Sequence, residues 1–162
     1  MDSQSVEADK QHLGRAVSLA LHNIRSGGGG PFGAVVTRAG TVIAEGCNEV
    51  VPGCDPTAHA EVVAIRRAAQ ALGRPHLDDC VLYASCEPCP MCLASAYWAR
   101  IPRVVFALTR DDAAAMGFSD AEIYKEVSLP ATQRAMRCEH RRPAEADMIQ
   151  VEWNAKADRR QY

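Results

Sequence analysis

Two short stretches that carry soft metal ligands constrain this chain more than any other feature: residues 59–61 and residues 86–92. Cys89 and Cys92 are three positions apart, which places both thiols on one face of a helix that begins near Pro90. Two thiolates and the imidazole of His59 select zinc over magnesium or calcium. Three protein ligands leave a fourth tetrahedral position for water, which is typical of a catalytic zinc site. The fold is therefore expected to bring the two stretches together.

Glu61 is expected to lie beside the metal without binding it. It comes two positions after His59, so the two side chains cannot share one helix face. A carboxylate in that place can take a proton from a zinc-bound water, whose pKa falls to about 7, and pass it on. Cys86 precedes Pro88, outside the helix face, and is expected to be buried and not to bind the metal. A structural zinc, a redox pair or part of an iron–sulfur run are the other interpretations of this cysteine spacing.

Hydrophobic periodicity and turn residues predict alternating helices and strands along the chain. The expected helices cover residues 13–24, 56–72, 90–99, 112–116, 120–127 and 148–157, and the expected strands cover residues 32–37, 42–50, 81–84 and 104–108. Asp55 and Pro56 are expected to cap and begin the second helix. The unit of strand, helix and strand around residues 81–108 predicts parallel pairing. The elements together predict an α/β fold with helices on the faces of a sheet.

Composition limits the class of protein and its compartment. A chain of 162 residues, 48% of them apolar, fits a single domain with a real core. No apolar run is long enough to cross a membrane, and the polar N-terminus is not typical of a signal peptide. Seven cysteines, three of them clustered, favour a reducing compartment, so we expect a cytoplasmic protein. The net charge of −2 does not favour nucleic acid as a partner.

The pattern His-x-Glu followed by Pro-Cys-x-x-Cys resembles the cytidine deaminase superfamily. Within it, the chain is similar to the small bacterial guanine deaminases, in residues 55–61, 85–92, 97–100 and 117–126 and in the final tyrosine. The resemblance implies a three-layer αβα fold with a mixed sheet of about five strands and helices on both faces. It implies one deaminase domain over residues 1–162, with one zinc per chain held by His59, Cys89 and Cys92 and with Glu61 as proton carrier. The implied reaction is hydrolysis of guanine to xanthine and ammonia, in purine catabolism or salvage.

The resemblance also assigns contacts with the base, and the residues concerned are Phe32, Asn48, Ala60, Trp98, Asp120 and Tyr162. Several have plainer interpretations: Asn48 as a turn residue, Phe32 and Trp98 as core, and Asp120 as a solvated loop residue. Ser119 interrupts the acidic pair expected there, and Asp111 and Asp112 are rival acids. In the guanine deaminases the C-terminal segment crosses to a partner subunit. The resemblance therefore implies a homodimer in which residues 130–162 are exchanged and Tyr162 reaches the partner's pocket.

Three other functions remain open on the sequence alone. A tRNA adenosine deaminase would share the zinc chemistry but would need a basic surface for an anionic stem-loop. Deaminases of cytosine, guanosine or another aminated heterocycle would share the motif. A zinc-stabilised binding module would have no open metal position and would release no ammonia.

Overall fold

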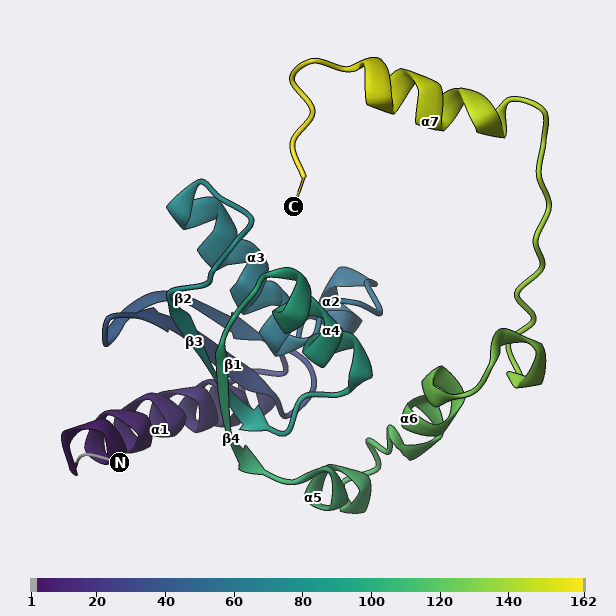
Figure 1. The fold of residues 1–162 in the computed structure, drawn as a ribbon. Coiled ribbons are helices and arrows are strands. Elements are labelled where there is room, and N and C mark those ends of the chain that lie inside the picture. The colour runs from purple at the N-terminus through teal and green to yellow at the C-terminus, as the bar shows by residue number, and fades with distance from the viewer. Residues whose placement is uncertain (1–2, 162) are drawn as a thin grey trace.

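The computed structural model describes residues 3–161, and it contains one sheet, seven α-helices and a short 3₁₀ helix within that range (Figure 1). The elements in chain order are α1 (Ser3–Arg25), β1 (Gly33–Arg38), β2 (Thr41–Cys47), α2 (Val50–Gly53), α3 (Ala60–Leu72), β3 (Cys80–Cys86), α4 (Pro90–Trp98), β4 (Arg103–Leu108), α5 (Arg110–Ala115), α6 (Ala121–Ser128), η1 (Ala131–Gln133) and α7 (Ala146–Ala155). None of these helices combines the length and apolar character that a membrane span requires.

The sheet is mixed and has the strand order β2-β1-β3-β4. β1 pairs antiparallel with both β2 and β3, and β3 pairs parallel with β4, which confirms the parallel pairing predicted for the strand–helix–strand unit. The described residues form four strands where about five were expected. After β4 the chain turns into α5, because Thr109 caps that helix: its hydroxyl accepts from the Asp112 backbone N–H, while the Asp112 carboxylate accepts from the Thr109 backbone N–H.

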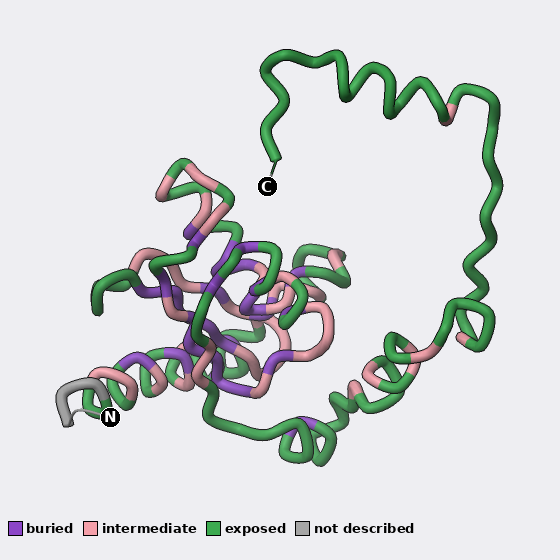
Figure 2. The backbone as a smooth tube through the Cα atoms, in the orientation of Figure 1, coloured by how far each residue is buried: buried purple, intermediate pink, exposed green. Residues whose placement is uncertain are grey.

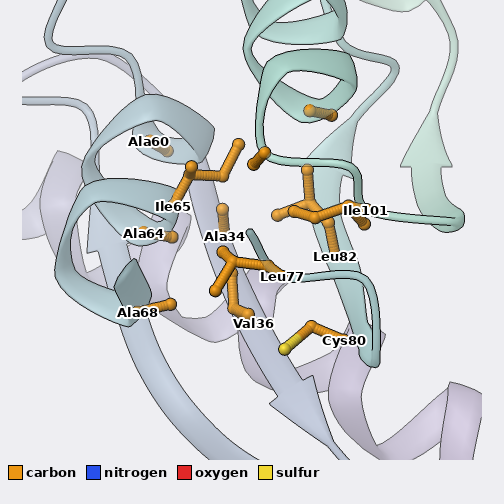
Figure 3. Close-up of a cluster of buried hydrophobic side chains, with 12 residues drawn as sticks. Ala34, Val36, Ala60, Ala64, Ile65, Ala68, Leu77, Cys80, Leu82 and Ile101 are labelled. Atoms are coloured by element: carbon orange, nitrogen blue, oxygen red, sulfur yellow. The ribbon is translucent and has the colours of Figure 1, made fainter. Parts of the chain in front are cut away.

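Helices cover both faces of the sheet, as predicted for a three-layer αβα fold. α1 packs on one face, against β1 and β3, while α3 and α4 lie on the other (Figure 1). The main core cluster lies between the sheet and α3 and α4, where Val36 and Leu82 meet Ala64 (Figure 3). Val35, between two residues of that cluster, points to the opposite face and packs with Ala16 of α1. This alternation follows from the two-residue period of a strand.

The predicted start of the second helix is wrong. α3 begins at Ala60, with His59 as its N-cap residue, and not at Asp55 and Pro56. The Asp55 carboxylate instead accepts hydrogen bonds from the backbone N–H and the hydroxyl of Thr57, at 2.8 and 2.6 Å. An aspartate that bonds its own backbone two residues on forms a turn rather than a cap. His59 is therefore the N-cap residue of α3, and Glu61 lies in the first turn of the same helix.

The buried face of α1 does not follow its large apolar side chains. Leu21 and Ile24 are exposed, whereas the polar residues His12 and Asn23 are buried. Asn23 is buried because its side-chain amide donates to the backbone carbonyls of Gly30 and Asn48, both at 2.9 Å. These two bonds hold the glycine-rich loop after α1 against the end of β2.

The C-terminal segment runs away from the body of the molecule. Beyond Leu129 the chain extends through η1 to α7, which stands clear of the sheet in Figure 1 and is almost entirely exposed in Figure 2. α7 carries large apolar side chains that its own chain leaves exposed, namely Met148, Ile149, Val151 and Trp153. A single chain therefore leaves the large apolar side chains of α7 uncovered.

Candidate active site

Two helix N-termini bring the predicted metal ligands together. His59 is the N-cap residue of α3 and Cys89 is the N-cap residue of α4, with Cys92 in the first turn of α4. Their three ligand atoms lie within 4.8 Å of one another. The His59 Nδ1 atom is 3.6 Å from the Cys89 sulfur and 3.5 Å from the Cys92 sulfur. Tetrahedral zinc with ordinary Zn–N and Zn–S bonds would separate such atoms by about 3.6 Å, so the donor set fits a zinc ion.

The site favours a thiolate on Cys89 before any ion binds. A hydrogen bond from the Cys92 thiol, joined by one with His59, lowers the pKa of Cys89 to about 4. The same contact with Cys89, together with burial, raises the pKa of Cys92 well above its usual range. The hydrogen bond with Cys89 also raises the pKa of His59. Since zinc binds deprotonated ligands, these groups would release protons when the metal enters.

Glu61 lies beside the cluster of His59, Cys89 and Cys92 and is not among the three residues whose ligand atoms converge. Its side chain is buried, with 7% of the residue exposed, and it comes from the first turn of α3. Burial raises the pKa of the Glu61 carboxyl, and the negative charge of Cys89 adds to this shift. A buried carboxyl whose pKa moves toward neutrality suits a group that accepts and returns protons.

A cavity of about 370 Å³ opens in front of these residues. The predicted site residues that line it are Phe32, Asn48, His59, Glu61, Cys89 and Asp120. Its volume is in the range of small-molecule sites. Burial raises the pKa of Asp120, which forms the N-cap position of α6 at the far side of the cavity.

Two predicted substrate residues, Ala60 and Trp98, do not line this cavity. Ala60 is fully buried at the first position of α3, within the core. Trp98 is 68% exposed and borders a shallow surface hollow with Tyr97 and Arg100. Tyr162 lies outside the described residues. Trp98 therefore does not reach this cavity within one chain.

Asn48 is oriented by backbone contacts. Its side-chain oxygen accepts from the backbone N–H groups of Gly30 and Val50, at 3.3 and 3.4 Å. Asn48 is also buried, and its carbonyl accepts from Asn23. This fixed orientation leaves the amide N–H₂ group of Asn48 as the donor available to a ligand.

The outer wall of the cavity comes from α5, α6 and their connection, and sequence reasoning identified only Asp120 there. The other wall residues are Arg110, Ala113, Phe118, Ser119 and Ile123. Glu87 joins them from residues 87–89, the loop between β3 and α4 that carries Cys89 and is called the metal loop below. Phe118 packs edge-on against Phe32, with ring centroids 5.0 Å apart. The family resemblance over residues 117–126 was the signal that could have indicated the part of the wall from Phe118 to Ile123.

The predicted burial of Cys86 is confirmed. It is buried, and its thiol donates to the Thr109 backbone carbonyl at 3.4 Å. Burial raises the pKa of Cys86 to about 11. Cys86 is therefore a protonated thiol that ties the end of β3 to the start of α5.

Comparison with known proteins identifies relatives that match most of this chain. The family described as the cytidine and deoxycytidylate deaminase zinc-binding region matches residues 6–108. A guanine deaminase of Bacillus subtilis is 49% identical over 156 residues, which cover 93% of this chain and 96% of that protein. The crystal structure of a guanine deaminase from Bacillus subtilis matches with a TM-score of 0.90 at 46% identity, over 100% of this chain and 99% of that one.

A shorter likeness reaches the tRNA deaminases. The tRNA-specific adenosine deaminase of Aquifex aeolicus is 40% identical over 77 residues, which cover 48% of this chain and 51% of that protein. The match with the Bacillus structure, in contrast, spans the whole chain and therefore includes the extended C-terminal segment.

Proposed function

Because this chain belongs to the family of cytidine and deoxycytidylate deaminases, we propose that it is a zinc-dependent enzyme that hydrolyses guanine to xanthine and ammonia. The observation that carries the proposal is the cluster of His59, Cys89 and Cys92 next to the buried Glu61. The guanine-deaminating relative is similar over nearly the full length, so the choice of base rests on more than the zinc motif.

Zinc held by His59, Cys89 and Cys92 would supply Lewis acidity, which lowers the pKa of a coordinated water to about 7. Glu61 then acts as the proton carrier of the chain. Its carboxylate takes one proton from the attacking water and delivers it to the ring nitrogen next to carbon 2. It then takes the remaining proton of the added oxygen and delivers it to the amine, which leaves as ammonia while the carbonyl at carbon 2 forms. Burial raises the pKa of Glu61, which favours a carboxyl that holds a proton before passing it on.

Recognition of the base is assigned to three groups that line the cavity. The ring of Phe32 offers a flat apolar surface on which a purine can stack. The Asn48 amide donates to an acceptor of the base, and the Asp120 carboxylate accepts from its ring N–H and amine. A pocket with buried polar groups rejects a base that leaves them unpaired. Adenine and cytosine present different donors and are expected to be poor substrates.

The C-terminal segment favours a homodimer. α7 leaves Ile149 and Trp153 exposed, and large exposed apolar side chains also lie on the body at Tyr97 and Trp98 of α4. Exchange of residues 130–162 between two copies would cover both surfaces, and symmetric exchange of an element is a common route to dimers. The end of the segment, Tyr162, would then close the partner's pocket and exclude water.

We place the reaction in the cytoplasm and in purine breakdown or salvage. All seven cysteines are free, and an exposed thiol such as Cys54 or Cys138 is typical of a reducing compartment.

Ammonia release by the purified zinc-loaded dimer tests the proposed function. The substrates are guanine, guanosine, adenine, cytosine, cytidine and a tRNA whose wobble position is adenosine. Guanine is expected to be turned over far faster than the other compounds. Editing of the tRNA with no reaction of guanine would transfer the chain to the tRNA adenosine deaminases, and no ammonia from any compound would favour a zinc-stabilised binding module.

A further inference from the structure

Three side chains and the backbone carbonyl of Pro88 form a closed ring of contacts beside the metal loop. The Arg110 guanidinium lies 4.4 Å over the ring of Tyr124 and 3.3 Å from the Glu87 carboxylate. The Tyr124 hydroxyl donates to the backbone carbonyl of Pro88 at 2.8 Å, and Pro88 immediately precedes the ligand Cys89. The Glu87 carboxylate also accepts from the Arg110 backbone N–H at 3.3 Å. The ring therefore joins the metal loop, the start of α5 and the first turn of α6.

This ring is the polar attachment of α6 to the body. α6 is otherwise loosely held: Ile123 and Val127 are 51% and 56% exposed, and none of its residues is fully buried. Burial of apolar surface therefore contributes little to the free energy that holds α6 against the body of the protein. Tyr124 is half-buried and, unlike Arg110 and Glu87, does not line the cavity.

Tyr124 lies one helical turn after Asp120, which is the N-cap residue of α6. The backbone N–H of Tyr124 donates to the Asp120 carbonyl at 3.0 Å, which closes the first turn of α6. Fixing the Tyr124 ring and hydroxyl therefore fixes the backbone that carries the Asp120 carboxyl at the cavity. We propose that Tyr124, held by Pro88 and Arg110, is a positioning residue that sets Asp120 at the distance from the metal loop that the base requires. This inference rests on the proposed function, in which Asp120 reads the base.

The variant Tyr124→Phe keeps the ring under Arg110 and removes only the hydroxyl bond to Pro88. The loss of one such bond corresponds to about a threefold to tenfold effect. The KM for guanine is expected to rise by that factor, with kcat within about twofold. A misplaced Asp120 weakens binding of the base equally in the ground state and in the transition state, and such a loss raises KM without changing kcat. Zinc content and the melting temperature are expected to match those of the wild type.

Tyr83→Phe is the matched control. The Tyr83 hydroxyl makes a bond of the same length, 2.8 Å, but to Asp9 of α1 on the opposite face of the sheet. This variant is expected to keep the wild-type KM. An equal rise in KM in both variants would assign the effect to general loosening and overturn the inference.

A double-mutant cycle with Asp120→Asn distinguishes positioning from structural support. If Tyr124 acts through Asp120, Tyr124→Phe should change KM by less than about twofold once Asp120 has been replaced, because coupled residues are not additive. Full additivity, a wild-type KM in Tyr124→Phe, or loss of zinc or fold in that variant would each overturn the inference. A wild-type enzyme that ignores guanine would instead refute the proposed function.

Discussion

The Nδ1 atom of His59 lies 3.5 Å from the Sγ atom of Cys92, although 33 positions separate the two residues in the chain. They meet because α3 and α4 pack on the same face of the sheet with their N-termini side by side. Each N-terminus carries a partial positive charge that favours thiolates. The metal site is therefore a product of how two helices are seated on the sheet as well as of the ligands themselves.

Cys92→Ala is expected to lose zinc, because it removes one of three ligands at 3.5–3.6 Å spacing. Cys86→Ala is the matched control, since its thiol faces the Thr109 carbonyl. Elemental analysis should find about one zinc per chain in the wild type and in Cys86→Ala, and far less in Cys92→Ala. Iron in the wild type, or a visible iron–sulfur absorbance, would refute the assignment of the metal.

Gly46→Ala is expected to lower both stability and activity. A Cβ atom on Gly46 would lie 2.3 Å from the Ala60 carbonyl oxygen and 2.7 Å from the Ala64 nitrogen, so α3 would have to move off β2. Overpacking of this kind costs about 1–3 kcal/mol, and the shift would carry His59 with it. Denaturant unfolding and zinc content measure the two effects.

Gly14→Ala provides the comparison for that variant. Gly14 is exposed within α1, and a Cβ atom there meets nothing within 4 Å. Replacing a helical glycine by alanine should stabilise the protein by about 0.5–1 kcal/mol. Equal effects of the two substitutions would contradict the close packing of α3 on β2.

Asp9→Asn is expected to reduce stability in a pH-dependent way. Arg103 donates to the Asp9 carboxylate at 2.9 Å, and this bond, with one from Tyr83, holds the pKa of Asp9 below its usual range. A group with a depressed folded pKa stabilises the protein above its unfolded pKa of about 3.9, and that contribution is lost as pH falls through the folded pKa. The expected loss is about 1 kcal/mol at pH 7.

Denaturant unfolding of both forms from pH 7 to pH 3 tests this expectation. The gap between wild type and Asp9→Asn should be constant down to about pH 5 and should narrow below pH 4. Glu7→Gln, which removes a fully exposed ion pair with Lys10 on the same helix, is expected to change nothing measurable. A gap that widened in acid would contradict the role of the Arg103 pair.

Deletion of Gln161 and Tyr162 is expected to leave zinc and melting temperature unchanged while guanine turnover falls sharply, because the proposed lid over the partner's pocket is lost. Gln161→Ala, which keeps the length of the segment, should retain activity.

Sedimentation should show a dimer for the wild type and a monomer after removal of residues 130–162. Unchanged turnover after deletion, or an active monomer, would remove the exchanged segment from the account.

The metal centre was predictable because its signal is local. Each ligand stretch begins a helix, and the spacing of Cys89 and Cys92 specifies one face whatever the rest of the chain does. The sheet and its parallel β3–β4 pair were predictable for the same reason, since periodicity and short connections decide them. Even here the start of α3 was misplaced, because Thr57 competes for the Asp55 carboxylate that was expected to cap the helix.

The pocket wall and the C-terminal segment depend on longer-range contacts that no local pattern reveals. Arg110 faces the cavity because of Glu87 and Tyr124, which lie 23 positions before and 14 positions after it. The exposed position of Trp98 on α4 follows from which face of that helix meets the sheet, and the helix is too uniformly apolar for its sequence to indicate that face.

The most direct test of the account is ammonia release from guanine by Glu61→Gln, measured together with its zinc content. The substitution preserves the shape of a side chain that is 7% exposed and removes its capacity to carry protons. We predict full zinc occupancy and a fall in kcat of at least about 10²–10⁴-fold, the usual contribution of one proton-transferring group. Near-normal turnover with zinc in place would contradict the assignment of Glu61 and the mechanism that depends on it.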